Sequence, residues 1–129
     1  MKRTIRVFSL LLAAVMLLSA QALATEPAQA FTDVSKQDYF YDAVNWAVEK
    51  VITCGVSKDV IAPKRDCTRA DFVTFLWRAA GSPSPKDGNN PFGDVQEDAY
   101  YYDAVLWAVE EGIAKGTSAD AFSPDAVVT

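Results

Sequence analysis

Side chains that could carry out acid–base or nucleophilic chemistry are present, but their spacing does not build a catalytic site. The 129 residues contain 17 acidic side chains, two cysteines and no histidine. Carboxylates pair at Glu110 with Glu111 and at Asp98 with Asp103, on stretches that have the pattern of solvated helical faces. The single Cys-Thr-Arg stretch has no partner base, and no glycine-rich phosphate loop occurs. The sequence therefore predicts a chain that is not an enzyme and needs no cofactor.

Acidic residues also gather in the second half of the chain, where Asp94, Glu97, Asp98 and Asp103 surround a run of tyrosines. A calcium loop of the common type needs oxygen ligands at positions 1, 3, 5 and 12, with a central glycine. This spacing does not match, and neither histidine nor a Cys-x-x-C motif is present. We therefore predict no metal site.

The two cysteines, Cys54 and Cys67, are compatible with a disulfide. A loop of this length contributes roughly 3 kcal/mol in the chain-entropy model, and an oxidising compartment would favour the bond. The sequence does not fix the distance between the two Cα atoms, so two separate thiols remain the alternative.

One block of the chain occurs twice. Residues 31–68 align without a gap on residues 92–129 at a constant offset of 61 residues, and 18 of the 38 pairs are identical. Repetition at this period indicates a supersecondary unit that buries its apolar face only against its neighbours.

Each copy contains a short amphipathic helix, expected over residues 41–51 in the first copy. The repeat places Gly112 where the second helix ends, and Val51 at the matching position. Because a β-branched residue tolerates positive φ poorly, we expect the first helix either to end differently or to carry some strain. Trp46 and Trp107 are expected to pack against a neighbouring helix. A further helix follows the first copy, because Thr68 is a good N-cap and Asp71 completes a capping box.

The first 24 residues have the pattern of a secretory signal peptide. A basic start precedes about 12 mostly apolar residues, too few for a span of roughly 20, and Ala22 and Ala24 stand before the expected cleavage point. Without this segment nine basic and 17 acidic residues remain, a formal charge of −8. That balance argues against nucleic acid and against association with an anionic membrane.

These signals divide the chain into four parts. We predict a signal peptide over residues 1–24, a first motif over 25–80, a linker over 81–91 and a second motif over 92–129 that lacks its second helix. Because Thr129 matches the N-cap Thr68, we expect a fragment of a longer protein.

Several short stretches, taken in order, resemble the S-layer homology (SLH) domains of bacterial surface proteins. The first motif contains Phe31-Thr32-Asp33-Val34, Tyr41-Asp42-Ala43-Val44-Asn45-Trp46-Ala47, Pro63, Thr68-Arg69-Ala70-Asp71 and Phe75-Leu76-Trp77-Arg78. The second contains Phe92-Gly93-Asp94-Val95, Trp107-Ala108, Gly112-Ile113, Gly116-Thr117 and Phe122-Ser123-Pro124. The resemblance covers nearly all of the chain from Phe31 onward.

The resemblance implies an all-α fold of repeated helix-loop-helix motifs, forming part of a pseudo-threefold helical bundle. It also implies a non-catalytic cell-surface anchor that binds anionic, pyruvylated secondary cell wall polysaccharide or a peptidoglycan-linked glycan, with further SLH motifs in the same or another chain as partners. Arg69 matches the arginine of the family's Thr-Arg-Ala-Glu signature, which is thought to meet the carboxylate of the ligand; Asp71 replaces its glutamate. A guanidinium can hold a carboxylate by two hydrogen bonds, and exposed amides at a helix start favour anions.

The other residues expected to bind the ligand are Lys115, Gly116 and Thr117, a polar loop, together with Asp33 and Asp94. The two aspartates have a second interpretation, because loop carboxylates that precede helices also form turns. Two alternative functions remain open: a surface that binds another protein, to which the consecutive tyrosines 100–102 would contribute, and the anchor of a longer secreted hydrolase. All of these place the chain outside the cell, at the cell surface or wall.

Overall fold

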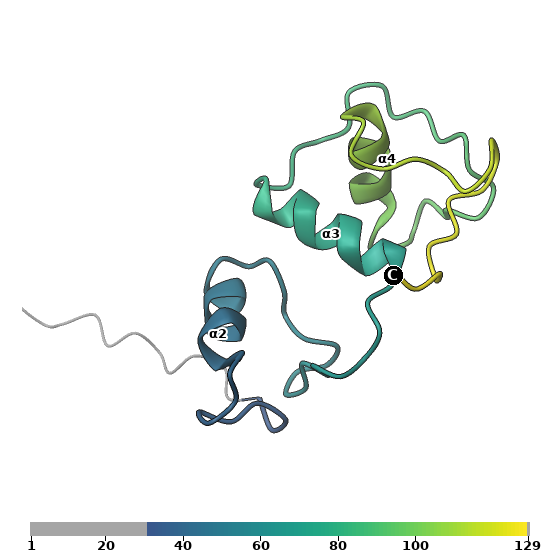
Figure 1. Cartoon of the computed structure of the whole chain (residues 1–129). Coiled ribbons are helices and arrows are strands. Elements are labelled where there is room, and N and C mark those ends of the chain that lie inside the picture. Colours follow the sequence, from purple (N-terminus) through teal and green to yellow (C-terminus); the bar gives the residue numbers. More distant parts are fainter. Residues whose placement is uncertain (1–30, 129) are drawn as a thin grey trace, which may run out of the picture.

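A computed structural model describes residues 31–128 of the chain; the predicted signal peptide lies outside them. The described residues form three α-helices, α2 (Tyr41–Glu49), α3 (Arg69–Ala79) and α4 (Tyr102–Glu110), joined by long loops (Figure 1). Within this part of the chain there is no strand, and pairing is limited to two isolated β-bridges. The predicted all-α fold is confirmed.

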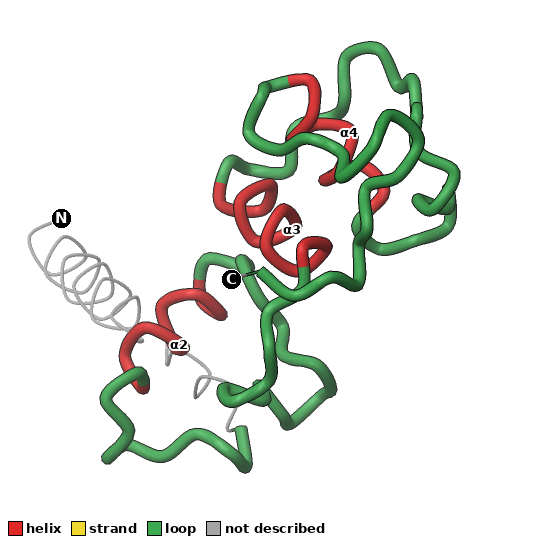
Figure 2. The backbone as a smooth tube through the Cα atoms, turned by 45° about the vertical axis from the view of Figure 1, so that its right-hand side comes forward, coloured by secondary structure: helices red, strands yellow, loops and turns green. Residues whose placement is uncertain are grey.

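Helices α3 and α4 lie side by side, whereas α2 stands apart from both (Figures 1 and 2). We call residues 31–67, which contain α2, the first unit, and residues 92–128, which contain α4, the second unit. The core lies between α3 and the second unit and consists of Val73, Phe92, Val95, Ala104, Val105, Ala108 and Phe122. Helix α3, which follows the first unit in the sequence, therefore packs on the second.

The start of α3 follows from its local sequence. The Thr68 hydroxyl accepts a hydrogen bond from the Asp71 amide, and the Asp71 carboxylate accepts one from the Thr68 amide. The two bonds form the predicted capping box and satisfy two otherwise unpaired amides. After Ala79 the chain turns at Gly81, whose φ of +88° needs a glycine.

Helices α2 and α4 end in the same way despite different residues. The residue two positions after each helix has positive φ, +58° at Val51 and +70° at Gly112. The following amide then bonds back into the helix in both units, Ile52 N–H to the Ala47 carbonyl and Ile113 N–H to the Ala108 carbonyl. Helix α2 is thus two residues shorter than expected. Of the two outcomes that the sequence left open, a different helix end is wrong, and Val51 carries the unfavourable positive φ.

Replacing Val51 with glycine should therefore stabilise the protein. A β-branched residue at positive φ costs of order 1–3 kcal/mol, and the greater chain entropy of glycine in the unfolded state offsets part of the gain. We expect the free energy of unfolding to rise by about 1 kcal/mol, measured by urea denaturation. Gly112→Val is the matched reverse substitution and should lower it; an unchanged stability of both variants would contradict this account.

The two tryptophans at matching positions differ in burial. Trp107 packs against the core, as expected for a residue that contacts a neighbouring helix. Trp46 is 55% exposed, and no residue of α2 is buried. The expected structural role is thus confirmed for Trp107 and wrong for Trp46, because in the described chain only the second unit is covered by α3.

Candidate ligand-binding site

Arg69, at the first turn of α3, is held against the last loop of the second unit. Its Nε–H donates to the Phe122 carbonyl at 2.9 Å, and its Nη2 donates to the Lys115 carbonyl at 2.6 Å. The guanidinium carbon lies 4.5 Å from the centre of the Phe122 ring, a cation–π distance. Three contacts therefore fix the orientation of this side chain.

These contacts leave part of the Arg69 guanidinium unused. An arginine carries five N–H donors, and two of them are engaged with carbonyls among the described residues. Among the described residues Nη1 makes no hydrogen bond, and Nη2 keeps one of its two hydrogens, so donors remain for a carboxylate. The side chain is partly exposed, so the arrangement can bind an oxyanion without first breaking an internal bond.

The fold brings the Lys115–Thr117 loop next to Arg69, whose Nη2 donates to the Lys115 carbonyl. Lys115 is exposed, and within residues 31–128 its ammonium has no hydrogen bond or ion pair. The Thr117 hydroxyl lies 2.6 Å from the Ser123 hydroxyl, so two hydroxyls border the same loop. A Cβ at Gly116 would collide with the Phe92 ring and two carbonyl oxygens, which explains the glycine there.

Asp33 and Asp94 hold the loops of the two units in matching ways. The Asp94 carboxylate accepts from the Phe122 and Ser123 amides at 2.8 Å, and Asp33 accepts from Ile61 and Ala62. The Ile61 and Ala62 amides lower the pKa of the Asp33 carboxyl. Partial burial raises the pKa of Asp94, but its two backbone hydrogen bonds outweigh this and leave it below the ordinary value. Both carboxylates thus form turns, and a ligand role for them stays a prediction.

The amides at the start of α3 are already hydrogen-bonded and not free for a ligand, contrary to the expectation from sequence. Arg69 N–H donates to the Ala126 carbonyl at 2.8 Å, and Ala70 N–H donates to the Pro124 carbonyl at 2.9 Å. The Asp71 amide is capped by Thr68. Because these donors are already used, any anion at this end of the helix must be bound by side chains.

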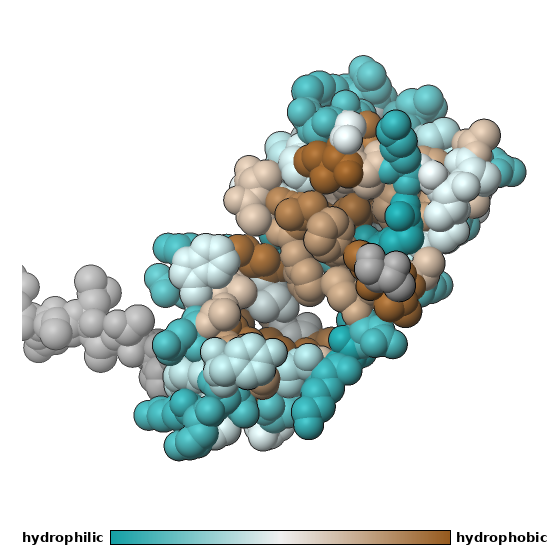
Figure 3. All heavy atoms as spheres, in the orientation of Figure 1, coloured by the Kyte–Doolittle hydropathy of each residue, from teal (hydrophilic) through white to brown (hydrophobic). Residues whose placement is uncertain are grey.

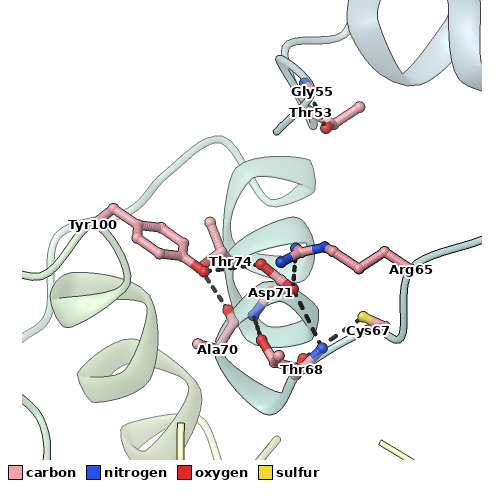
Figure 4. Close-up of polar contacts among 9 residues, drawn as sticks. All are labelled: Thr53, Gly55, Arg65, Cys67, Thr68, Ala70, Asp71, Thr74 and Tyr100. Atoms are coloured by element: carbon pink, nitrogen blue, oxygen red, sulfur yellow. Dashed lines mark hydrogen bonds and ion pairs between the residues drawn. The ribbon is translucent and has the colours of Figure 1, made fainter. Parts of the chain in front are cut away.

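Asp71 contacts residues of both units, and the sequence predicted only its contact with Thr68. Its side chain is buried and, besides capping, accepts from Arg65 Nη2 at 2.6 Å and from the Tyr100 hydroxyl at 2.8 Å (Figure 4). Burial alone would raise the pKa of Asp71, but the hydrogen bonds from Tyr100 and Thr68 and the charge of Arg65 lower it overall. The recurrence of tyrosine at positions 39 and 100 was the signal in the sequence that Tyr100 matters, but it did not show that Tyr100 contacts Asp71.

Tyr100 is affected in the opposite direction by the same contact. Partial burial, together with the hydrogen bond to the Asp71 carboxylate, raises the pKa of the phenol to about 12. The phenol therefore stays protonated and donates over the whole physiological range of pH. Asp71 joins α3 to both units, because Arg65 belongs to the first unit and Tyr100 to the second.

The two cysteines are separate thiols in this structure. Cys54 is exposed, while Cys67 is half-buried and its Sγ lies 3.6 Å from the Thr68 carbonyl oxygen. Burial raises the pKa of the Cys67 thiol. Of the two alternatives left open by the sequence, the structure shows the two separate thiols.

A cavity of about 630 Å³ lies between the first unit and α3. Its apolar lining includes Ala47, Ile52 and Ile61 of the first unit and Phe75 of α3, beside the polar Thr74. In Figure 3 apolar side chains surround a hollow between the parts of the molecule that contain α2 and α3. Within residues 31–128 no group of three or more acidic, cysteine or histidine side chains could hold a metal ion. In the same part of the chain, none of the helices has the length and apolarity needed to cross a membrane.

The relatives of the chain include proteins of bacterial surface layers and an endoglucanase. It is 32% identical over 98 residues to an S-layer protein of Bacillus thuringiensis subsp. finitimus, covering 75% of this chain and 12% of that protein. It is 34% identical over 91 residues to the surface-layer 125 kDa protein of Lysinibacillus sphaericus, covering 70% and 8%. An endoglucanase of Bacillus sp. (strain KSM-635) is 30% identical over 100 residues, covering 77% and 10%. The chain thus spans a small part of the length of each.

The family comparison agrees with the two units. The model of the S-layer homology domain matches residues 30–73 and 91–129. The first match contains the first unit and the start of α3, and the second contains the second unit. The chain belongs to the S-layer homology domain family.

Proposed function

We propose that this cell-surface anchoring module binds an anionic cell-wall glycan without forming a covalent bond, and that Arg69 holds a carboxylate of the glycan. The supporting observation is the fixed Arg69 guanidinium, whose Nη1 makes no hydrogen bond among the described residues, beside the exposed Lys115. A pyruvylated secondary cell wall polysaccharide carries carboxylates of this kind. Bidentate binding of a carboxylate is the geometry for which arginine is suited and lysine is not.

The charge of the chain is consistent with a local rather than a diffuse attraction. The chain as a whole carries a formal charge of −5, so a polyanion is not attracted by the average surface. Arg69 and Lys115 place two positive groups on one side of the second unit. Their attraction for a bound carboxylate would favour binding at this place, although the chain as a whole is negative. Binding should accordingly weaken as salt is raised.

Two broader statements follow from family membership. The S-layer homology domain is a non-catalytic anchoring module and acts at the cell surface or wall. Because one relative is an endoglucanase of which the chain matches 10%, we also propose, as a second candidate, that the chain anchors a longer secreted protein that has a hydrolase domain.

Arg69→Ala should abolish binding to Gram-positive cell-wall sacculi in co-sedimentation, with at least a tenfold loss of affinity, because the carboxylate loses both N–H donors. Arg69→Lys keeps the charge but not the fork and should bind weakly. Stripping the ketal pyruvate from the sacculi with mild acid should abolish binding of the unchanged protein.

Two controls make this experiment decisive. Lys64→Ala removes an exposed positive charge of the first unit that takes no part in the proposed contacts, and it should bind normally. Lys115→Ala alters no internal contact of the described residues, so it tests the site even if Arg69→Ala weakens the fold. If Arg69→Ala and Lys115→Ala both bound the sacculi as well as the unchanged protein does, with circular dichroism showing intact helices, the proposed site would be refuted.

A further inference from the structure

The two carbonyls that hold the Arg69 guanidinium come from the two ends of one loop of the second unit. Arg69 Nη2 donates to the Lys115 carbonyl at 2.6 Å, and Arg69 Nε donates to the Phe122 carbonyl at 2.9 Å. The loop between these carbonyls is closed by Thr117 N–H, which donates to the Ala121 carbonyl at 2.8 Å. The conformation of this loop therefore sets the direction in which the guanidinium points.

The end of the loop that carries the Phe122 carbonyl has an unfavourable backbone conformation. Ser123 has φ of +58°, a left-handed value that residues other than glycine adopt at a cost. Such a conformation persists only where the surrounding contacts enforce it. The Phe122 carbonyl belongs to the peptide group that joins Phe122 to Ser123, so a change of φ at Ser123 would turn this carbonyl away from its present direction.

Asp94 holds that same peptide group from its other side. The Asp94 carboxylate accepts from the Ser123 amide and from the Phe122 amide, both at 2.8 Å. In a planar trans peptide group the N–H and the C=O point in opposite directions. With the Ser123 N–H fixed on Asp94, the Phe122 carbonyl is aimed at Arg69 Nε.

The first unit contains the same turn without an arginine bound to it. Asp33 accepts from the Ile61 and Ala62 amides, and Ala62 has φ of +57°. Within residues 31–128 no donor bonds to the Ile61 carbonyl, the counterpart of the Phe122 carbonyl. An aspartate is thus sufficient to form the turn, and in the second unit the arginine follows the turn instead of shaping it.

We propose that Asp94 is a positioning residue for Arg69. Its carboxylate holds the peptide group between Phe122 and Ser123, and the carbonyl of this group holds Arg69 Nε–H. The guanidinium is then oriented before a ligand arrives, as a preorganised binding group requires. This role is an alternative to the direct ligand contact that the sequence predicted for Asp94. Its effect on binding rests on the proposed glycan site, whereas the orientation of Arg69 does not.

The direct test follows the Arg69 Nε–H resonance of the full chain by NMR after the substitution Asp94→Asn. An asparagine side chain has one carbonyl oxygen, so it can accept from one of the two amides but presents N–H donors to the other. The Arg69 Nε–H signal should shift toward that of a solvated arginine and should exchange faster with water. Asp33→Asn makes the same change in the first unit and should leave this signal unchanged.

A second variant keeps the test valid if Asp94→Asn disturbs the fold. A glycine adopts positive φ without the cost that other residues have. Asp94→Asn combined with Ser123→Gly should therefore keep the shape of the turn and recover part of the Arg69 Nε–H signal. A folded double variant that recovers none of this signal would show that Asp94 does not act through the turn, and the proposal would be wrong.

Co-sedimentation with Gram-positive sacculi then separates positioning from direct contact. Asp94→Asn should weaken binding by about tenfold, the effect of losing about one hydrogen bond, and should cause no further loss when Arg69→Lys is already present. A further loss there, or an unchanged Arg69 signal in folded Asp94→Asn, would overturn the proposal. If the signal moves but neither Asp94→Asn nor Arg69→Ala alters binding, the glycan site is refuted while the positioning of Arg69 by Asp94 is supported.

Discussion

Phe122→Ala should unfold the second unit at ordinary temperature. Phe122 is completely buried, contacts the Phe92 ring at a centroid distance of 5.6 Å and lies under the Arg69 guanidinium. Truncating a buried phenylalanine costs about 3–5 kcal/mol, a large share of the roughly 5–15 kcal/mol that stabilises a typical domain. We expect loss of the near-ultraviolet circular dichroism of Trp107 and loss of a cooperative thermal transition.

The repeat supplies a matched control for this experiment. Ile61 occupies the position of Phe122 in the first unit but is only half-buried, because α3 does not cover it. Ile61→Ala should therefore lower the melting temperature much less than Phe122→Ala. Similar losses from the two substitutions would mean that both units are equally covered in solution, contrary to the structure.

Asp71→Ala should produce the second large effect. The substitution removes a carboxylate that accepts hydrogen bonds from Arg65, Thr68 and Tyr100 and leaves these donors unpaired in a partly buried position. Hydrogen bonds to charged groups contribute about 1.5–3 kcal/mol each. Because Arg65 is half-exposed and can be solvated, we expect a total loss of about 2–4 kcal/mol in urea denaturation.

The same carboxylate predicts how stability depends on pH. The pKa of Asp71 is lower in the folded protein than in the unfolded chain, so its stabilising contribution is fully present above about pH 4. The contribution is lost as pH falls through the folded pKa, because the unfolded state then binds the proton more readily. Between pH 5 and pH 2 the free energy of unfolding should fall less steeply with pH for Asp71→Ala than for the unchanged protein. An identical slope for the two proteins would exclude this role of Asp71.

Tyr100 gives the opposite dependence at alkaline pH. Its folded pKa is raised to about 12, above the ordinary value of 10.0, so its contribution is present below pH 10 and lost as pH rises toward 12. The hydrogen bond between Tyr100 and Asp71 therefore stabilises the fold between the pH at which Asp71 is protonated and the pH at which Tyr100 is deprotonated. Tyr100→Phe should remove the alkaline part of this dependence.

Local features of the fold could be predicted from the sequence because their causes are local. The capping box of Thr68 and Asp71 depends on residues three positions apart. The strained turn at Val51 follows from a β-branched residue at a position that favours glycine. Arg69 could be assigned to the candidate site from its motif, but its carbonyl partners lie 46 and 53 residues away in the sequence.

The partner of each helix could not be predicted in this way. An apolar stripe indicates that one face of a helix is buried, but not which element covers it. Trp46 and Trp107 lie in nearly identical helices, so their sequences gave the same expectation for both. Their different burial arises because α3 covers α4 and leaves α2 open. The shared Asp71 junction was missed for the same reason, since Tyr100 lies 29 residues away from Asp71 in the sequence.

The packing of α3 on the second unit also determines how such a chain can grow through gene duplication. The repeat of 61 residues and the folded pair do not coincide along the sequence, because α3 follows the first unit in the sequence and covers the second. If this arrangement is repeated, a duplicated period brings the helix that covers the copy after it. Gain or loss of one whole period leaves every such junction intact, so the number of motifs can change during evolution without redesign of any interface.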